Sequence, residues 1–152
     1  MSSFLERIDP VFVAPSTDDW TDWLGWATDL PASVAMGLVC VSTGPSRTVM
    51  TMAEAAWPLN PNGSVHGGLV AAAADQVGGV AAVAACGEGA FPATATLSAH
   101  YLRPALPGLT FAGKLIRGGK RTLFIDIDVT DRNGALCTKF SGTWSVSGAT
   151  PK

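Results

Sequence analysis

The sequence predicts an α+β fold, in which a curved antiparallel sheet wraps around one long central helix. A run rich in Ala and Val, without proline, extends from residue 69 to residue 86 and predicts the helix. Segments with strand-like alternation precede and follow this run, and clusters of Gly, Pro, Asn and Asp separate them. The 152 residues suffice for one domain with a core of its own.

The first 32 residues are expected to form an arm outside the main domain. A short helix is predicted at residues 18–29, with Thr17 or Asp18 as its N-cap. Tryptophans recur at every third position of this segment and form one aromatic stripe: Trp20, Trp23 and Trp26. The stripe could seal the edge of the core, or it could line part of an acyl or aryl pocket.

The main domain is expected to span residues 33–147 and to be followed by a tail at residues 148–152. It would open with a hairpin and close, after the helix, with four strands that follow one another as a meander. Strands are predicted at residues 34–42, 47–52, 93–102, 110–116, 122–130 and 136–146. Within 122–130, Leu123, Ile125, Ile127 and Val129 are expected to face inward, whereas Asp126 and Asp128 face outward. Asn133-Gly134 is a strong hairpin signal.

The central helix is predicted from its composition, because alanine has the highest helix propensity. It would begin after the Gly-rich turn at residues 60–68 and end near residues 87–89. A helix that is apolar on most faces is expected to be buried. We expect no membrane span, because glycines and Asp75 interrupt the apolar run.

The composition argues against several classes of function. A net charge of −2 gives no basic footprint for nucleic acid. Cys40, Cys86 and Cys137 lack the spacing of a metal site or a disulfide framework and are expected to be small core residues. The N-terminal segment does not resemble a signal peptide. We therefore expect a cytoplasmic protein with no nucleic-acid, membrane or metal partner.

The beginning of the central helix is the candidate functional site. The first amides of a helix have no internal partner, and the macrodipole makes that end electropositive. Gly67 and Gly68 carry no side chains that would shield these amides, so a carbonyl oxygen that becomes negative could bind there. The same glycines could instead serve only a tight turn. Asp75, the single carboxylate of the apolar run, is either a general base or a buried structural residue.

The spacing of these residues predicts a dimer. Gly68 and Asp75 are seven residues apart, which separates them by about 10 Å along the helix axis. Catalytic contacts need about 3 Å, so one helix cannot supply both groups to one site. Two antiparallel helices across a two-fold axis could bring Asp75 of one subunit to the helix start of the other. We expect two composite sites per dimer.

The segment Asn60-x2-Gly63-x-Val65-His66-Gly67-Gly68-x6-Asp75 resembles the corresponding motif of the hotdog-fold acyl-CoA thioesterases of the PaaI type. The segments Tyr101-Leu102-Arg103-Pro104, Gly118-Gly119-Lys120-Arg121 and Asp131-x2-Gly134 also resemble the family pattern. The resemblance covers about residues 33–147 and leaves the Trp-rich arm unassigned. It implies an acyl-CoA substrate without a separate cofactor, and a homodimer or a dimer-of-dimers tetramer.

The resemblance also implies a role for each residue of the motif. Gly67 would donate its amide to the thioester carbonyl, and Asp75 of the other subunit would act as general base or nucleophile. Asn60 would orient the thioester or the water. His66 would support the loop or polarise the substrate. Thr94 falls where some relatives have a serine that helps to position water.

Coenzyme A carries three phosphate groups, so basic residues are candidates for its binding. These candidates are Arg103 and the hairpin residues Arg117, Gly118, Lys120 and Arg121, although the hairpin could equally be an ordinary solvated turn. The expected function is hydrolysis of a small aryl- or medium-chain acyl-CoA. A hotdog-type enoyl-CoA hydratase or dehydratase and a non-catalytic acyl-CoA-binding module are the alternatives.

Overall fold

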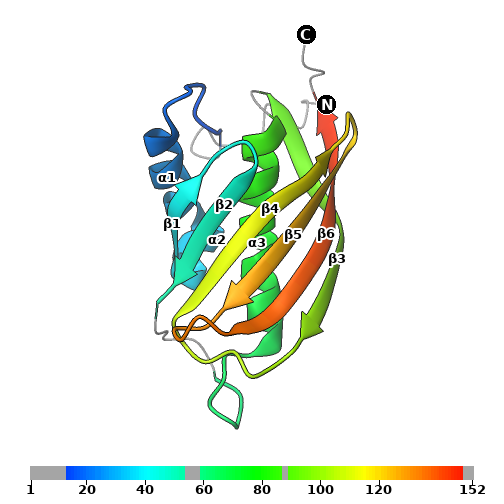
Figure 1. The fold of residues 1–152 in the computed structure, drawn as a ribbon. Helices are drawn as coiled ribbons and strands as arrows, with labels where there is room; N and C mark the ends of the chain where they lie inside the picture. Colours follow the sequence, from blue (N-terminus) through cyan, green and yellow to red (C-terminus); the bar gives the residue numbers. More distant parts are fainter. Residues whose placement is uncertain (1–12, 54–58, 87–88, 149–152) are drawn as a thin grey trace, which may run out of the picture.

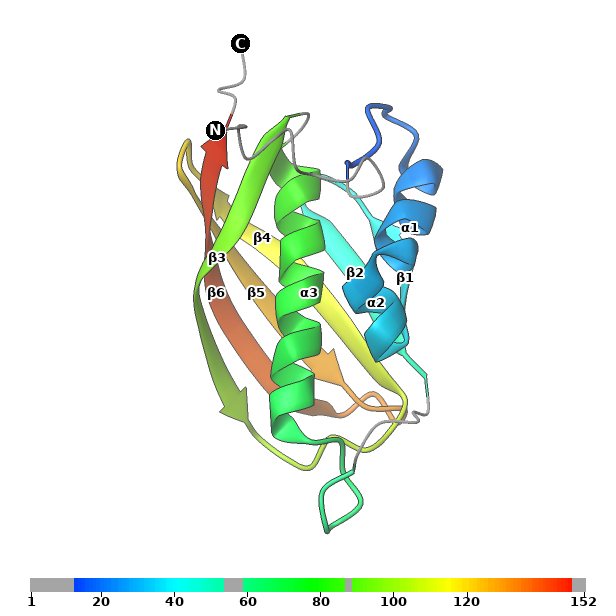
Figure 2. The ribbon, with the colours of Figure 1, turned by 180° about the vertical axis from the view of Figure 1, so that it is seen from behind.

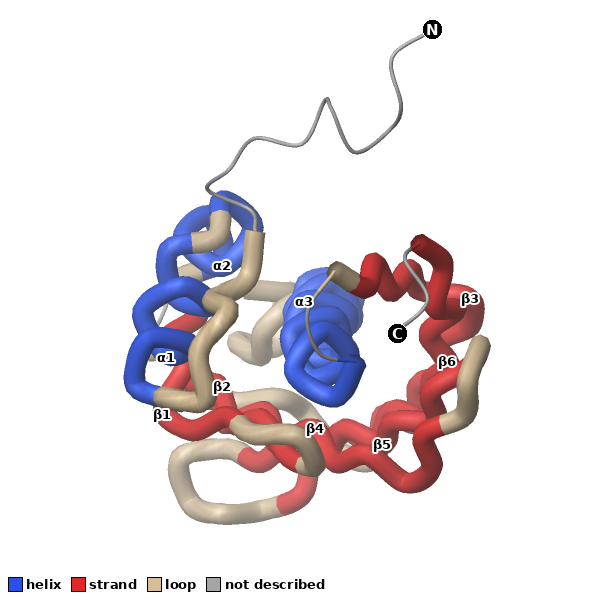
Figure 3. Tube along the Cα trace, turned by 90° about the horizontal axis from the view of Figure 1, so that it is seen from above, coloured by secondary structure: helices blue, strands red, loops and turns tan. Residues whose placement is uncertain are grey.

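A computed structural model describes residues 13–53, 59–86 and 89–148, and it confirms the predicted α+β architecture. A six-stranded antiparallel sheet curves around the long helix α3 (Figures 1 and 3). The helices are α1 (Trp20–Asp29), α2 (Pro31–Met36) and α3 (Gly67–Cys86). The strands are β1 (Leu38–Thr43), β2 (Arg47–Met52), β3 (Ala90–Tyr101), β4 (Leu109–Gly118), β5 (Thr122–Thr130) and β6 (Leu136–Gly148).

The order of the strands in the sheet is β1-β2-β4-β5-β6-β3. The predicted meander is correct for β4, β5 and β6, but it is wrong for β3, which pairs with β6 and not with β4. The connection from β3 to β4 contains Pro104 and Pro107 and crosses the end of the sheet instead of folding back as a hairpin. The N–H groups of Leu102 and Arg103 donate to the Cys137 carbonyl, which holds this connection in place.

Strand β1 begins at Leu38, four residues after the predicted start at residue 34, because Pro31–Met36 forms the helix α2. Pro31 occupies the first turn, where a missing N–H costs nothing, and Gly37 ends the helix in a left-handed conformation at φ 66°. The N-cap of α1 is Asp19, which accepts a hydrogen bond from the Thr21 N–H, and not the predicted Thr17 or Asp18. Helix α1 packs beside β1 (Figure 1).

Helix α3 packs one face against the concave side of the sheet. Its buried positions include Val70, Ala73 and Val77, and large side chains of the sheet such as Phe111 and Trp144 are also buried in this core. About half of the helix is buried, which is less than expected. On the side seen in Figure 2, no described element lies over α3.

Among the described residues, α3 is long and apolar enough to cross a membrane by length and composition alone. This differs from the expectation that its glycines and single carboxylate exclude a span. Its place inside the curved sheet is that of a core helix.

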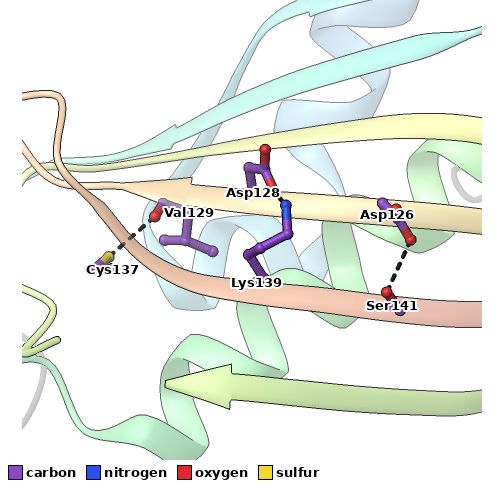
Figure 4. A network of polar contacts seen from close by, with 6 residues as sticks. All are labelled: Asp126, Asp128, Val129, Cys137, Lys139 and Ser141. Atoms are coloured by element: carbon purple, nitrogen blue, oxygen red, sulfur yellow. Dashed lines mark hydrogen bonds and ion pairs between the residues drawn. The ribbon is translucent and has the colours of Figure 1, made fainter. Parts of the chain in front are cut away.

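The convex face of the sheet carries polar pairs between β5 and β6 (Figure 4). Ser141 Oγ donates to Asp126 Oδ1 at 2.9 Å, and Lys139 forms an ion pair with Asp128 at 2.6 Å. The hydrogen bond that Lys139 donates to the Asp128 carboxylate raises the pKa of Lys139. Because both partners are exposed, the pair contributes less than about 1 kcal/mol to stability. The predicted inward and outward faces of β5 are confirmed.

Candidate active site at the start of α3

The loop before α3 is closed by hydrogen bonds between Asn60 and Ser64. Asn60 Nδ2 donates to Ser64 Oγ at 2.6 Å, and Asn60 Oδ1 accepts from the Ser64 N–H at 3.1 Å. The Asn60 N–H also donates to the Ser64 carbonyl at 2.8 Å. Gly63 turns the chain between them at φ 78°. Asn60 therefore fixes the loop, and its predicted orienting role would use the remaining hydrogen-bonding capacity of its amide.

His66 caps the first turn of α3 with both its backbone and its ring. Its carbonyl accepts from the N–H groups of Leu69 and Val70, at 2.9 and 3.0 Å. Its Nδ1 accepts from the Gly68 N–H at 3.0 Å. A ring nitrogen that accepts a hydrogen bond carries no proton, so this contact requires the neutral tautomer with its proton on Nε2. His66 thus supports the loop, which is one of its two predicted roles.

Tyr101, at the end of β3, holds the same turn from the other side. Its hydroxyl donates to the Gly67 carbonyl at 2.6 Å. The peptide unit between Gly67 and Gly68 is therefore fixed at both ends, its oxygen by Tyr101 and its N–H by His66. Among the residues that the structure describes, no group accepts a hydrogen bond from the Gly67 N–H.

The two glycines are explained by close contacts and not by the backbone conformation. Neither Gly67 nor Gly68 has a positive φ, so a tight turn does not require glycine here. A Cβ added to Gly67 would lie 3.3 Å from the Tyr101 ring, and one added to Gly68 would lie 3.1 Å from the His66 ring. The missing side chains leave room for both rings and leave the Gly67 amide accessible to a ligand.

Asp75 lies two turns farther along α3 and is held by Thr94 of β3. Thr94 Oγ1 donates to Asp75 Oδ1 at 2.6 Å. A β-bulge between Thr94 and Thr96 makes this contact possible, because it places Ala95 outside the regular pairing. Thr94 pairs with Trp144, whose ring points toward α3, so Thr94 shares that face.

The structure separates Asp75 from the start of its own helix. Asp75 follows Gly67 by eight residues, which corresponds to about 12 Å along the axis. This distance agrees with the expectation that one α3 cannot supply both the amide and the carboxylate to one reacting group.

The comparison with protein families decides the family of the chain. The model of the thioesterase superfamily matches residues 62–138, just over half of the chain. The chain belongs to the thioesterase superfamily. The match includes the start of α3, Asp75 and Thr94, and it excludes α1, α2 and the first two strands.

Individual relatives of this thioesterase-superfamily chain agree with that result. It is 38% identical over 85 residues to a protein of Saccharolobus solfataricus that is provisionally named an esterase; this covers 55% of the chain and 56% of that protein. The chain thus spans just over half the length of this curated relative. The E. coli PaaI protein, from the phenylacetic acid degradation operon, is similar with a TM-score of 0.76 and 25% identity, over 86% of this chain and 94% of that one.

A Streptococcus mutans protein solved with bound acetyl-CoA is similar with a TM-score of 0.68 and 25% identity, over 75% of this chain and 91% of that one. Together with the family match, these structures confirm the predicted hotdog fold of the PaaI type.

The basic residues of this thioesterase-superfamily chain lie in two separate places. Arg103 lines a cavity of about 290 Å³ at the start of α3, together with Asn60, Gly67 and Tyr101. The hairpin at residues 117–121 lies at the far end of β4. The ten residues of this strand span about 33 Å, so the hairpin and Arg103 lie at opposite ends of the sheet. One chain therefore does not bring the two predicted groups of coenzyme A ligands together.

Two residues of the site were not predicted from the sequence. Ser64 is buried and anchors the loop through Asn60. The alternation of its strand places Tyr101 on one face with Leu97 and Ala99, but the hydrogen bond of its hydroxyl to the Gly67 carbonyl was not predicted.

Proposed function

We propose that this chain is an acyl-CoA thioesterase that hydrolyses small aryl- or medium-chain acyl-CoA to the free acid and coenzyme A. The observation that carries this proposal is the Gly67 N–H, for which no described residue provides an acceptor, at the electropositive end of α3 and next to a peptide unit that His66 and Tyr101 hold fixed. A fixed donor stabilises the oxyanion of a thioester in its transition state without the cost of reorganisation. The acetyl-CoA bound to the similar Streptococcus mutans protein supports the substrate class.

The second part of the site would come from another copy of the chain. Strand β3 lies at the edge of the sheet, and most of its residues are exposed on both faces. Unpaired strand edges favour pairing with another strand. The uncovered side of α3 lies beside this edge (Figure 3) and carries small residues such as Ala72 and Gly79. A two-fold dimer through β3 and α3 would place Asp75 of one subunit near Gly67 of the other.

The proposed reaction uses water as the attacking group. Asp75 takes a proton from water while the water oxygen forms a bond to the thioester carbon. The carbonyl oxygen becomes negative and accepts a hydrogen bond from the Gly67 N–H. Collapse of the tetrahedral intermediate breaks the carbon–sulfur bond, and the proton on Asp75 passes to the leaving coenzyme A thiolate, which restores the carboxylate. Thr94 holds Asp75 Oδ1 and leaves Oδ2 available for water.

The acyl group would extend toward the tryptophans of α1. A cavity of about 330 Å³ lies between α1, the end of α3 and the start of β3, and its aromatic walls are Trp23, Trp26 and Phe91. Phe91 precedes Thr94 by three residues, or about 10 Å along the strand. Such walls suit an aryl ring or a medium-length chain. Trp23 is also buried in α1, so the stripe would serve both predicted purposes.

Coenzyme A would be bound by cations from both subunits. Arg103 lines the cavity next to Gly67, whereas Arg117, Gly118 and Arg121 belong to the distant hairpin. In an antiparallel pair of α3 helices, the hairpin of one subunit lies toward the half of the dimer that contains the other subunit's helix start. Arg103 of one chain and the hairpin of its partner could then contact one coenzyme A.

A thiol-release assay over acetyl-, octanoyl- and phenylacetyl-CoA tests the proposal. We expect release of coenzyme A, and we expect Asp75→Asn to lower kcat by at least about 100-fold without unfolding the chain. Asp29→Asn, at the exposed end of α1, is the matched control and should keep wild-type activity. Wild-type kcat in Asp75→Asn would refute the role of Asp75 as base or nucleophile.

The alternatives give different results in the same samples. Binding of acyl-CoA without release of thiol would favour a binding module. Loss of the double bond of an enoyl-CoA without release of thiol would favour a hydratase. Single-turnover hydrolysis in ¹⁸O water separates the two roles of Asp75, because only a nucleophilic carboxylate incorporates the label into the protein.

A further inference from the structure

A third cavity, of about 470 Å³, opens at the C-terminal end of α3. Its walls come from the end of the helix, the start of β3, the hairpin between β4 and β5, and β6. Most of the side chains that line it are apolar, and they include Ala85, Leu115, Leu123 and Val146. The volume lies within the range of about 300 to 1,000 Å³ that is typical of small-molecule sites.

Within one chain, this cavity is distinct from the candidate active site. Cys86, one of its lining residues, follows Asp75 by eleven residues, or about 16 Å along the helix axis. It also differs from the cavity beside the tryptophans of α1, which lies on the other side of Ala90 and shares only that residue with it.

One cation lies at the cavity among the described residues. Lys120 lines it and Arg121 follows Lys120 in the hairpin, whereas Arg117 pairs with the exposed Phe124 and so lies on the convex face of the sheet. Lys120 and Arg121 are exposed, and neither forms an ion pair with another described residue. An apolar interior behind a cationic rim suits an amphiphile with an anionic head. Lysine presents a point charge on a flexible stem, which can reach a single carboxylate at the rim.

We propose that this cavity binds a medium-chain carboxylic acid, with the carboxylate at Lys120 and the hydrocarbon chain against Leu115, Leu123 and Val146. The site does not require that the chain hydrolyses acyl-CoA. If it does, the ligand belongs to the same chemical class as the released acid, and the cavity is a separate binding site for that class.

Cys86 provides a test that is independent of activity. It is half-buried and lines the cavity, whereas Cys40 and Cys137 are buried in the core. Burial raises the pKa of the Cys86 thiol, so its alkylation by iodoacetamide is followed at mildly alkaline pH and located by mass spectrometry. Octanoate at saturation should slow the alkylation of Cys86 by at least about tenfold. From hexanoate to decanoate, each added methylene should lower the concentration of fatty acid that gives half-maximal protection of Cys86 by about fourfold.

Matched variants and ligands identify the role of the charge. Octanol should protect Cys86 less than octanoate does, and Lys120→Ala should remove this difference. Lys114→Ala, an exposed lysine of β4 that does not line the cavity, should leave it unchanged. Cys40 and Cys137 serve as internal controls for unfolding. Each of three results would overturn the proposal. Octanoate could leave the alkylation rate of Cys86 unchanged, or octanol and octanoate could protect Cys86 equally. The third such result is that Lys114→Ala removes the difference between the two ligands as fully as Lys120→Ala does.

Discussion

Helix α3 contains two Gly-Gly pairs that look alike in the sequence but lie in different surroundings. Gly67 and Gly68 begin the helix, and their absent side chains make room for the rings of Tyr101 and His66. Gly78 and Gly79 lie in its middle. A Cβ at Gly78 would overlap the Trp144 ring, whereas a Cβ at Gly79 would meet nothing within 4 Å.

The difference separates a positioning role from a packing role. At the first pair, the neighbouring rings form hydrogen bonds to the exposed backbone, and the Gly67 N–H has no acceptor in the described part of the chain. At Gly78, the neighbour is a large apolar ring, which lies between the helix and Gly142 of its own strand. Gly79 lies on the uncovered side of α3, where only another molecule would approach it. Substitutions at the first pair should therefore change activity, and a substitution at Gly78 should change stability.

The largest effect is expected for Gly78→Ala. The added methyl group overlaps the buried Trp144 ring, so either the ring or the helix must move, and we expect a loss of about 2 to 3 kcal/mol in the free energy of unfolding. Urea denaturation followed by tryptophan fluorescence measures it. Gly79→Ala is the matched control and should be neutral or stabilising by up to about 1 kcal/mol, because alanine favours the helix. Equal losses in both variants would contradict the distinction between the two positions.

Local patterns in the sequence were sufficient to predict α3, β2 and β5 nearly to the residue. An Ala-rich run and a strict alternation each depend only on neighbouring residues. The short helix α2 was missed, because Val34 and its neighbours in a six-residue segment look like a strand. The pairing of β3 with β6 was also missed, since the path of the chain after α3 decides which edge of the sheet β3 joins.

The candidate site was predicted in part for a similar reason. Gly67 and Asp75 stand out in their own segment, one by the lack of a side chain and the other by its charge in an apolar run. The contact between Thr94 and Asp75 depends on a bulge at Ala95, which no local signal marks. The hydrogen bond of Tyr101 joins residues 34 positions apart.

The second effect concerns the first glycine pair. Tyr101→Phe removes the donor to the Gly67 carbonyl but keeps the ring against Gly67. We expect kcat for acyl-CoA hydrolysis to fall by about tenfold, or about 1.4 kcal/mol, with KM within about twofold of wild type. Steady-state kinetics on the best substrate of the panel measures both constants.

A purely structural role for Tyr101 would give a different pattern. Lower stability with unchanged kcat per folded site would assign the hydroxyl to folding alone. The amide signals of Gly67 and Gly68 in a ¹⁵N-correlated spectrum provide a second readout, because they should shift in Tyr101→Phe even if the chain hydrolyses no acyl-CoA.

A smaller effect is expected for substrate binding at the distant hairpin. Arg121→Ala should raise KM by about three- to fivefold while kcat changes less, because an exposed cation near phosphate contributes about 1 kcal/mol or less. Arg47→Ala, on the first hairpin of the sheet, is the control for a general loss of positive charge. An unchanged KM would remove Arg121 from the proposed coenzyme A ligands and leave Arg103 as the stronger candidate.

The smallest effect is expected at alkaline pH, where the Tyr101 hydroxyl beside the first glycine pair loses its proton. Burial raises the pKa of Tyr101 above its ordinary value of 10.0, so the folded chain holds the phenol proton more tightly than the unfolded chain does. The resulting stabilisation is complete below the unfolded pKa and is lost as the pH rises through the folded pKa. Tyr101 is the only tyrosine, so the ultraviolet absorbance of tyrosinate reports it alone. We expect a higher midpoint in the native chain than in urea, and kcat should fall along the same curve because a phenolate cannot donate to Gly67. Equal midpoints in the two states would show that the hydroxyl is not held as described.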